Sequence, residues 1–143
     1  MPLTDNQADQ IATLLNERNE LVVQYDRKRV LDAADNYICR FSDTGEVIAF
    51  VEIKAVQWYQ AEIRHLTVAI PYERNGHAKA LLSEAERIGR TKGVRLLQCT
   101  IRMENEASRK LFEGFGFLHV STFLNQRSGN SVGVFQKVLA SVA

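Results

Sequence analysis

The feature that most constrains this chain is a strand-like run that passes through a short polar turn into a helix, over residues 66–82. Residues 66–70 are apolar, and the helical pattern that follows opens on Gly76 and Ala78. The first N–H groups of a helix have no internal partner and lie at the positive end of the helix dipole. Small residues there let an anion approach the backbone. The segment therefore predicts a strand, a turn and a helix, with a candidate cradle for a diphosphate.

The composition is typical of a globular protein. The 143 residues are 45% hydrophobic and 24% charged, with a net charge of +1 at pH 7, which suits a single domain over residues 1–143. This charge gives no sign of a basic surface, so we do not expect nucleic acid as a partner. No apolar run approaches the ~18 residues of a membrane span, and no secretory signal is recognisable. Cys39 and Cys99 lie in strand-like segments, and we expect reduced core thiols and a cytoplasmic protein.

The hydrophobic pattern predicts the order helix, helix, three strands, helix, strand, helix and two strands. Thr4 and Gln7 form a capping-box signature before the first helix, and a second, weaker helix is expected over Arg27–Ala34. Ala78–Ile88 has strong helical periodicity, and Asn105 is placed to cap a short last helix. The predicted strands are Asn36–Phe41, Val47–Ala55, Ala61–Ala69, Val94–Ile101, Phe117–Phe123 and Val132–Val138. The architecture expected is a mixed α/β sheet with helices on its faces.

The strand at 61–69 breaks its own alternation. Its apolar positions are Ile63, then Leu66 and Val68, so one step is three residues instead of two. A β-bulge produces such a phase slip, and bulges concentrate beside active sites. An irregular strand end produces the same pattern, and both interpretations stay open.

Two motifs together resemble the GNAT family of N-acetyltransferases. Residues 73–78, ERNGHA, resemble its [QR]-x-x-G-x-[GA] pyrophosphate loop, and residues 105–117, NEASRKLFEGFGF, resemble its N-x-x-[AS]-x-x-x-[YF]-x-x-x-G-F helix and turn. A short glycine motif alone is weak evidence. The two motifs occur in the expected order and in the expected strand or helix context, and the resemblance extends over residues 36–138.

The resemblance implies the GNAT fold, a mostly antiparallel sheet of roughly six to seven strands with about four helices. It also implies a splay between the strand that ends near Val68 and the strand that starts at Val94, with acetyl-CoA as co-substrate in the splay and no metal. Backbone groups of Leu66, Thr67 and Val68 would pair with the pantetheine arm. Backbone amides would hold the diphosphate at Arg74, Asn75, Gly76, His77, Ala78 and Lys79.

The second motif implies further cofactor contacts. Asn105 would meet the pantetheine or thioester, although an N-cap role explains it equally, and Arg109 would reach the nucleotide end or lie in solvent. Phe112 aligns where many members carry a tyrosine that protonates the departing thiolate, and phenylalanine has no proton to give. Solvent or another residue then serves, or the thiolate leaves unprotonated. In the first motif Glu73 replaces the usual Gln or Arg and would repel a diphosphate unless it points away, while Arg74 supplies positive charge.

The reaction implied is direct attack of a neutral amine on the thioester, which calls for a proton acceptor. Glu62 is the first candidate base, because it precedes Gly76 at the spacing at which histone-type members place a glutamate. Its alternative is a solvated strand carboxylate paired with a cross-strand cation. His65 and His119 are weaker candidates for the base, and Tyr72 is a weak candidate for an acid.

The resemblance thus predicts an N-acetyltransferase that uses acetyl-CoA and acts on a primary amine of a small molecule or protein, as a monomer or homodimer without a membrane partner. The alternative is a CoA-binding module without catalysis. Phe112 favours this module, and Glu62 favours the enzyme. An acetylating toxin directed at tRNA is a third, weaker hypothesis, because the near-neutral charge gives it no support. The residues expected to form the acceptor groove carry no recognisable specificity code.

Overall fold

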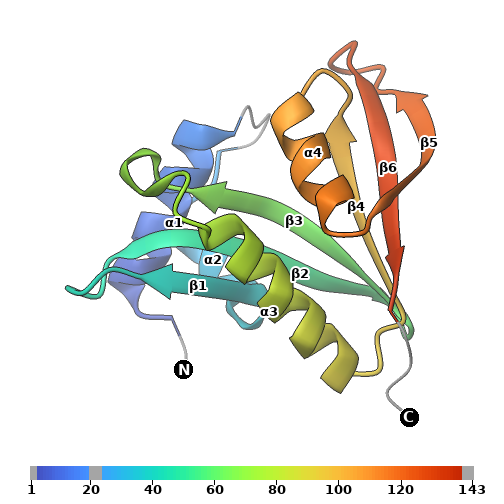
Figure 1. The fold of residues 1–143 in the computed structure, drawn as a ribbon. Coiled ribbons are helices and arrows are strands. Elements are labelled where there is room, and N and C mark those ends of the chain that lie inside the picture. The colour runs from blue at the N-terminus through green and yellow to red at the C-terminus, as the bar shows by residue number, and fades with distance from the viewer. Residues whose placement is uncertain (1–2, 20–23, 140–143) are drawn as a thin grey trace. The chain divides into compact units, whose positions relative to one another are not determined.

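The structure, a computed structural model, describes residues 3–19 and 24–139. Its strands form a six-stranded sheet in the order β1-β2-β3-β4-β6-β5 (Figure 1). Along the chain the elements are α1 (Asp5–Arg18), α2 (Arg27–Asp32), η1 (Ala34–Asn36), β1 (Tyr37–Phe41), β2 (Val47–Gln57), β3 (Gln60–Val68), η2 (Ile70–Tyr72), α3 (His77–Thr91), β4 (Leu96–Arg102), α4 (Glu106–Gly114), β5 (Leu118–Leu124) and β6 (Ser131–Val138). The predicted order of helices and strands is confirmed, with two short 3-10 turns in addition.

The chain forms two compact units. The first consists of Met1–Ile53 and His65–Ala85, and the second of Lys54–Arg64 and Glu86–Ala143. The division passes through β2, β3 and α3, so each unit holds part of these three elements.

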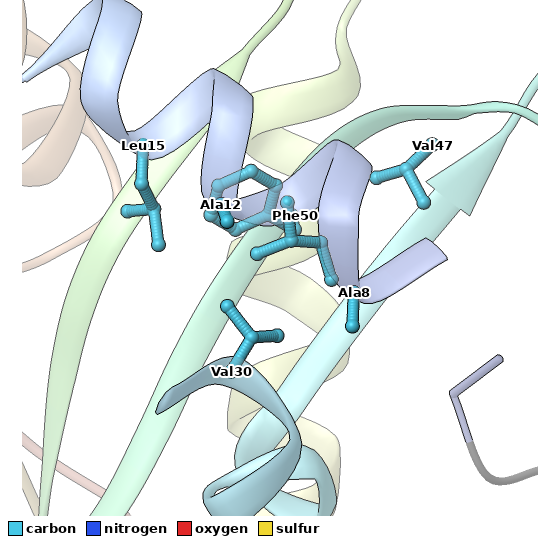
Figure 2. Packing of buried hydrophobic residues seen from close by; sticks show 7 residues of the cluster. Ala8, Ala12, Leu15, Val30, Val47 and Phe50 are labelled. Atoms are coloured by element: carbon cyan, nitrogen blue, oxygen red, sulfur yellow. The ribbon is translucent and has the colours of Figure 1, made fainter. Parts of the chain in front are cut away.

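The first unit is built on the N-terminal helix. Thr4 and Gln7 form the predicted capping box: the Gln7 backbone N–H donates to Thr4 Oγ1 over 3.1 Å, and the Thr4 N–H donates to Gln7 Oε1 over 3.0 Å. The apolar face of α1 then packs on α2 and β2 (Figure 2). The buried core of this cluster is Ala8, Ile11, Ala12, Leu15, Val30, Val47 and Phe50.

The first unit also contains the end of β3 and the start of α3. His65, inside β3, has a φ of +53°, a left-handed conformation at the predicted phase slip. The expected apolar phase is wrong beyond this point, because Thr67 is buried at 4% exposure while Leu66 and Val68 are only half-buried. Ala61, Ile63 and Thr67 are all buried, so the buried positions of β3 keep a period of two on both sides of His65.

The second unit contains an antiparallel three-stranded part of the sheet, in the order β4-β6-β5, and the helix α4. β4 pairs antiparallel with β6 from Leu96↔Val138 to Arg102↔Val132, and β5 pairs antiparallel with β6 with a register shift between His119 and Ser121. β3 pairs parallel with β4 over the short ladder Gln60–Glu62 with Leu96–Gln98. In α4 and the turn after it, Phe112 and Phe117 are buried with ring centroids 5.1 Å apart.

Several element ends differ from the predicted ones. β2 extends to Gln57, and α2 ends at Asp32 with the turn η1 beyond it. β4 begins at Leu96, because the Val94 N–H donates to Gly89 O over 2.9 Å, which closes the end of α3. Such shifts of one to three residues reflect local capping hydrogen bonds.

Both cysteines carry free thiols, as expected. Burial raises the pKa of Cys39 to about 11, and burial together with the nearby Glu62 carboxylate raises the pKa of Cys99 to about 12. In the described part of the chain, no helix is both long and apolar enough to cross a membrane.

Candidate cofactor-binding and active site

The predicted diphosphate loop lies in the first unit between η2 and α3. Arg74 has a φ of +65° and Gly76 a φ of +81°, two left-handed residues separated by Asn75. Left-handed residues in a turn direct successive N–H groups toward one side, which forms an anion-binding concavity. No atom lies within 4 Å of the position that a Cβ on Gly76 would take. The loop therefore offers backbone donors and open space at the start of α3, as a phosphate group requires.

Glu73 was expected to repel a diphosphate, but in the structure its charge is paired. The Glu73 carboxylate is paired with the Arg18 guanidinium from α1, so its negative charge is compensated. Arg40 Nε donates to His77 Nδ1 over 2.7 Å. The neutral ring of His77 then carries its proton on Nε2. Arg40, with the exposed Arg74 and Lys79 of the loop and first helical turn, adds positive charge at this helix start.

Other predicted residues of this unit have structural roles. The Tyr72 ring meets His77 edge-on with 6.3 Å between centroids, and the side chain is half-buried, so packing explains its position. Thr67 Oγ1 donates to the His65 carbonyl over 3.0 Å and accepts from Asn19 Nδ2 over 3.3 Å. The backbone pairing of Leu66, Thr67 and Val68 with a pantetheine arm stays a prediction.

In the second unit, Asn105 is the N-cap of α4: its Oδ1 accepts from the Ser108 N–H over 3.1 Å. Arg109, one turn into the helix, is half-buried, and its Nε is buried without a hydrogen-bond partner among the described residues. A buried guanidinium N–H is almost always satisfied in a native protein. An oxygen of a bound ligand is therefore a fitting partner for Arg109. Phe112, at the usual tyrosine position, is buried against Phe117.

Glu62 and His119 both have partners in the second unit. Arg64 Nε lies 3.5 Å from Glu62 Oε1, so this carboxylate pairs with a cation of its own strand and not with the cross-strand cation expected as the alternative. The role of Glu62 as a base stays a prediction. His119 stacks on Phe135 at 4.9 Å between centroids, and its Nε2 lies 2.7 Å from Thr122 Oγ1. Packing and this hydrogen bond support the structural interpretation of His119.

The structure places His65, one of the weaker base candidates, in a cluster of the first unit whose other members the sequence did not single out. Glu52 of β2 is buried at 5% exposure, and its Oε1 lies 3.9 Å from His65 Nε2, while the Tyr25 hydroxyl lies 3.2 Å from the same nitrogen. One signal was available in the sequence: Glu52 is the only ionisable residue in the otherwise apolar run 47–53. The partners Tyr25 and His65 are distant in sequence, and only the fold brings the three side chains together.

Comparison with known proteins defines the class of protein. Among solved structures, Ard1 from Thermoplasma volcanium superposes with a TM-score of 0.85 at 14% identity, covering 99% of this chain and 97% of that one. The structure of yncA from Salmonella typhimurium with its cofactor acetyl-CoA gives a TM-score of 0.84 at 15% identity, covering 100% and 94%. The ribosomal-protein-S18-alanine N-acetyltransferase from Escherichia coli gives 0.77 at 20% identity, covering 100% and 94%. The fold is that of the acetyltransferases.

The family assignment comes from the sequence itself. The model of the acetyltransferase (GNAT) family matches residues 5–117. This chain belongs to the GNAT family. No curated protein matches it in a sequence search.

Proposed function

We propose that this protein is an N-acetyltransferase that transfers an acetyl group from acetyl-CoA to a primary amine of a small molecule or protein. The observation that carries the proposal is the loop before α3, with Arg74 and Gly76 left-handed and open space above Gly76. The orphaned Nε of Arg109 is an independent sign of a ligand oxygen. The two free cysteines suit a reducing compartment such as the cytoplasm.

In this proposal, different residues of the chain bind different parts of the cofactor. Backbone amides of residues 74–79 hold the diphosphate, with charge support from Arg40, Arg74 and Lys79. Arg109 donates to a polar oxygen of the cofactor, and Asn105 holds the start of its helix in place. Acetyl-CoA supplies an activated acetyl thioester when bound.

The chemistry also needs a proton acceptor, since an alkylamine is almost fully protonated at pH 7. Glu62 is the candidate proton acceptor that the sequence indicates, and its carboxylate lies beside Arg64 in the structure. Phe112 offers no acidic proton to the leaving group. A thiolate with an ordinary pKa near 8.5 leaves without help at neutral pH more easily than an alkoxide does.

The absence of a hydroxyl at Phe112 favours one alternative, a CoA-binding module without catalysis. Of the two functions, only the enzyme releases thiol from acetyl-CoA when an acceptor amine is present. We expect thiol release from acetyl-CoA above the rate of hydrolysis with at least one member of a panel of polyamines, aminoglycosides, free amino acids and peptides with a free N-terminal alanine.

The matched variants for this assay are Glu62→Gln, which removes a candidate base, and Glu104→Gln, which removes an exposed carboxylate elsewhere in the same unit. Tight CoA binding without thiol release on any acceptor would establish the binding module and end the enzyme proposal. Acetylated product, identified by mass spectrometry, would end the alternative.

A further inference from the structure

The C-terminal end of α1 contacts the segment that carries the proposed diphosphate loop. The Arg18 guanidinium, in the last turn of α1, pairs with the Glu73 carboxylate, which directly precedes the left-handed Arg74. The next residue, Asn19, donates from Nδ2 to Thr67 Oγ1 over 3.3 Å. Two neighbouring side chains at the end of α1 therefore reach the end of β3 and the loop that follows it.

Arg18 is positioned by the packing of its own helix. Ile11 and Leu15 precede it on α1 and are fully buried in the core of the first unit. The Asn19 N–H donates to Leu15 O over 3.1 Å and completes the last turn. A cation in that turn is also favoured by the negative end of the helix dipole. The core of the unit thus places the guanidinium beside Glu73.

Glu73 is a local source of repulsion for an anion, because it is the one acidic residue among residues 69–80 of the sequence. Like charges at short range oppose binding. The side chains of Arg18 and Glu73 keep 35% and 43% exposure, so solvent screens their charges only in part. With both side chains present the charges cancel, and without the guanidinium one negative charge remains beside the loop.

We propose that Arg18 is a positioning residue of the cofactor site that acts through Glu73. Its guanidinium cancels the charge of that carboxylate and holds it in the ion pair, so that the backbone amides of residues 74–79 accept a diphosphate without a competing negative charge. An ion pair with this much exposure contributes little to folding stability, so its main effect is on ligand affinity. This inference rests on the proposed binding of acetyl-CoA by the loop.

Calorimetric titration of CoA into a double-mutant cycle tests the proposal. We expect Arg18→Gln to raise the dissociation constant about tenfold, because it leaves one partly screened negative charge near the diphosphate. Glu73→Gln should bind CoA at least as tightly as the wild-type protein does. The double variant, Arg18→Gln with Glu73→Gln, should return to within about threefold of wild type, since both charges are absent.

The cycle separates charge compensation from a purely structural tie between α1 and the loop. All three variants lose the tie, so a structural role predicts weaker CoA binding in each of them. That pattern would overturn the proposal, as would a double variant that binds as weakly as Arg18→Gln. Arg18→Lys keeps the charge without the planar guanidinium, and we expect its affinity for CoA to stay within about threefold of wild type.

The salt dependence of binding is a second readout, which a structural tie does not change. Between about 0.1 M and about 1 M NaCl the screening length falls from ~10 Å to ~3 Å. We expect the ratio of the CoA dissociation constants of Arg18→Gln and wild type to fall from about tenfold to about twofold over this range. A ratio that stays constant would contradict compensation by charge.

Arg27 provides the matched control. Its Nη2 lies 2.6 Å from Asp9 Oδ2, so Arg27→Gln also removes an arginine–carboxylate pair on α1 in the same unit. Asp9 precedes Arg18 by about 13 Å along the helix. We expect Arg27→Gln to bind CoA as the wild-type protein does. Equal weakening by Arg27→Gln and Arg18→Gln would contradict a role that depends on Glu73.

The outcomes separate this inference from the proposed function. If Arg18→Gln binds CoA as tightly as an active wild-type protein, the role of Arg18 is overturned and the acetyltransferase stands. If the wild-type protein binds no CoA, the proposed function and this inference both fail. Circular dichroism checks the fold of each variant. If Arg18→Gln does not fold, weaker CoA binding by Glu73→Gln overturns the proposal on its own.

Discussion

At the scale of single residues, the molecule concentrates unusual backbone geometry at two places in the first unit. His65, Arg74 and Gly76 all have positive φ, and two of the three have side chains. A side chain at positive φ is strained, so its retention in a strand or a phosphate loop indicates a functional demand. At Arg74 the positive φ fits the proposed diphosphate loop.

Residue burial makes a prediction about the cysteines. Because burial raises the pKa of Cys39 to about 11, and burial with the Glu62 carboxylate raises that of Cys99 to about 12, the thiolate fraction at pH 8 is very small. We expect both thiols to react with a disulfide reagent at least ~100-fold more slowly than free cysteine at that pH, and at the ordinary rate after unfolding in guanidinium. Fast labelling of the native protein would contradict the buried positions of these two strands.

The distant partners of individual polar side chains could not be predicted from the sequence. Glu73 with Arg18 and His77 with Arg40 are pairs that only the fold creates. Hydrophobic periodicity reports on near neighbours in the chain and carries no information about which distant charge a side chain will meet. From the sequence alone, Glu73 is expected to repel a diphosphate. In the structure, Arg18 of α1 pairs with this carboxylate and compensates its charge.

At the scale of elements, the sequence was far more informative. Capping signals at Thr4 and Asn105 located two helix starts, because a cap is a local hydrogen bond that one short motif determines. The apolar residues of β3 break their alternation in the sequence, but the buried positions Ala61, Ile63 and Thr67 keep a period of two, and the positive φ of His65 was not foreseen. The burial of Thr67 was not predictable, since its hydroxyl has Asn19, the C-cap of α1, as a partner.

One ion-pair network joins two elements of the second unit and predicts a pH dependence. Glu86 of α3 lies 3.0 Å from both Arg90 NH2 and Lys137 Nζ of β6. Burial alone would raise the pKa of the Glu86 carboxyl, but hydrogen bonds from Lys137 and Arg90 outweigh it and hold the pKa below its ordinary value.

A carboxyl with a depressed folded-state pKa stabilises the fold above its unfolded pKa, and this contribution is lost as pH falls through the folded value. We therefore expect Glu86→Gln to be less stable than wild type at pH 7, and the difference to shrink steadily below pH ~4.3, the ordinary glutamate value. Urea unfolding at pH 7, 4 and 3 measures it, with the exposed Glu104→Gln as control. A difference that is equal at all three pH values would contradict the network.

At the scale of the whole molecule, the order of elements and the mixed six-stranded sheet were predictable, because amphipathic periods and turn residues recur through the chain. The prediction of a single domain stays a prediction. Membership of the GNAT family is established by the match over residues 5–117, and it carries the fold with it. The acceptor is determined by surface side chains, for which the sequence has no comparable pattern.

The central claim is that the loop before α3 holds a diphosphate, and a pair of matched variants tests it directly. Gly76 and Gly45 both lie in the first unit at φ +81° and +86°, and at both positions no atom lies within 4 Å of an added Cβ. Glutamate at either position therefore brings similar backbone strain, on the order of 1 kcal/mol, and one negative charge. Only Gly76 belongs to the proposed cradle.

Calorimetric titration with CoA is the measurement that decides. We expect the dissociation constant of Gly76→Glu to rise at least ~30-fold, corresponding to about 2 kcal/mol, while Gly45→Glu binds as the wild-type protein does. Equal affinity of Gly76→Glu and wild type for CoA would contradict the account.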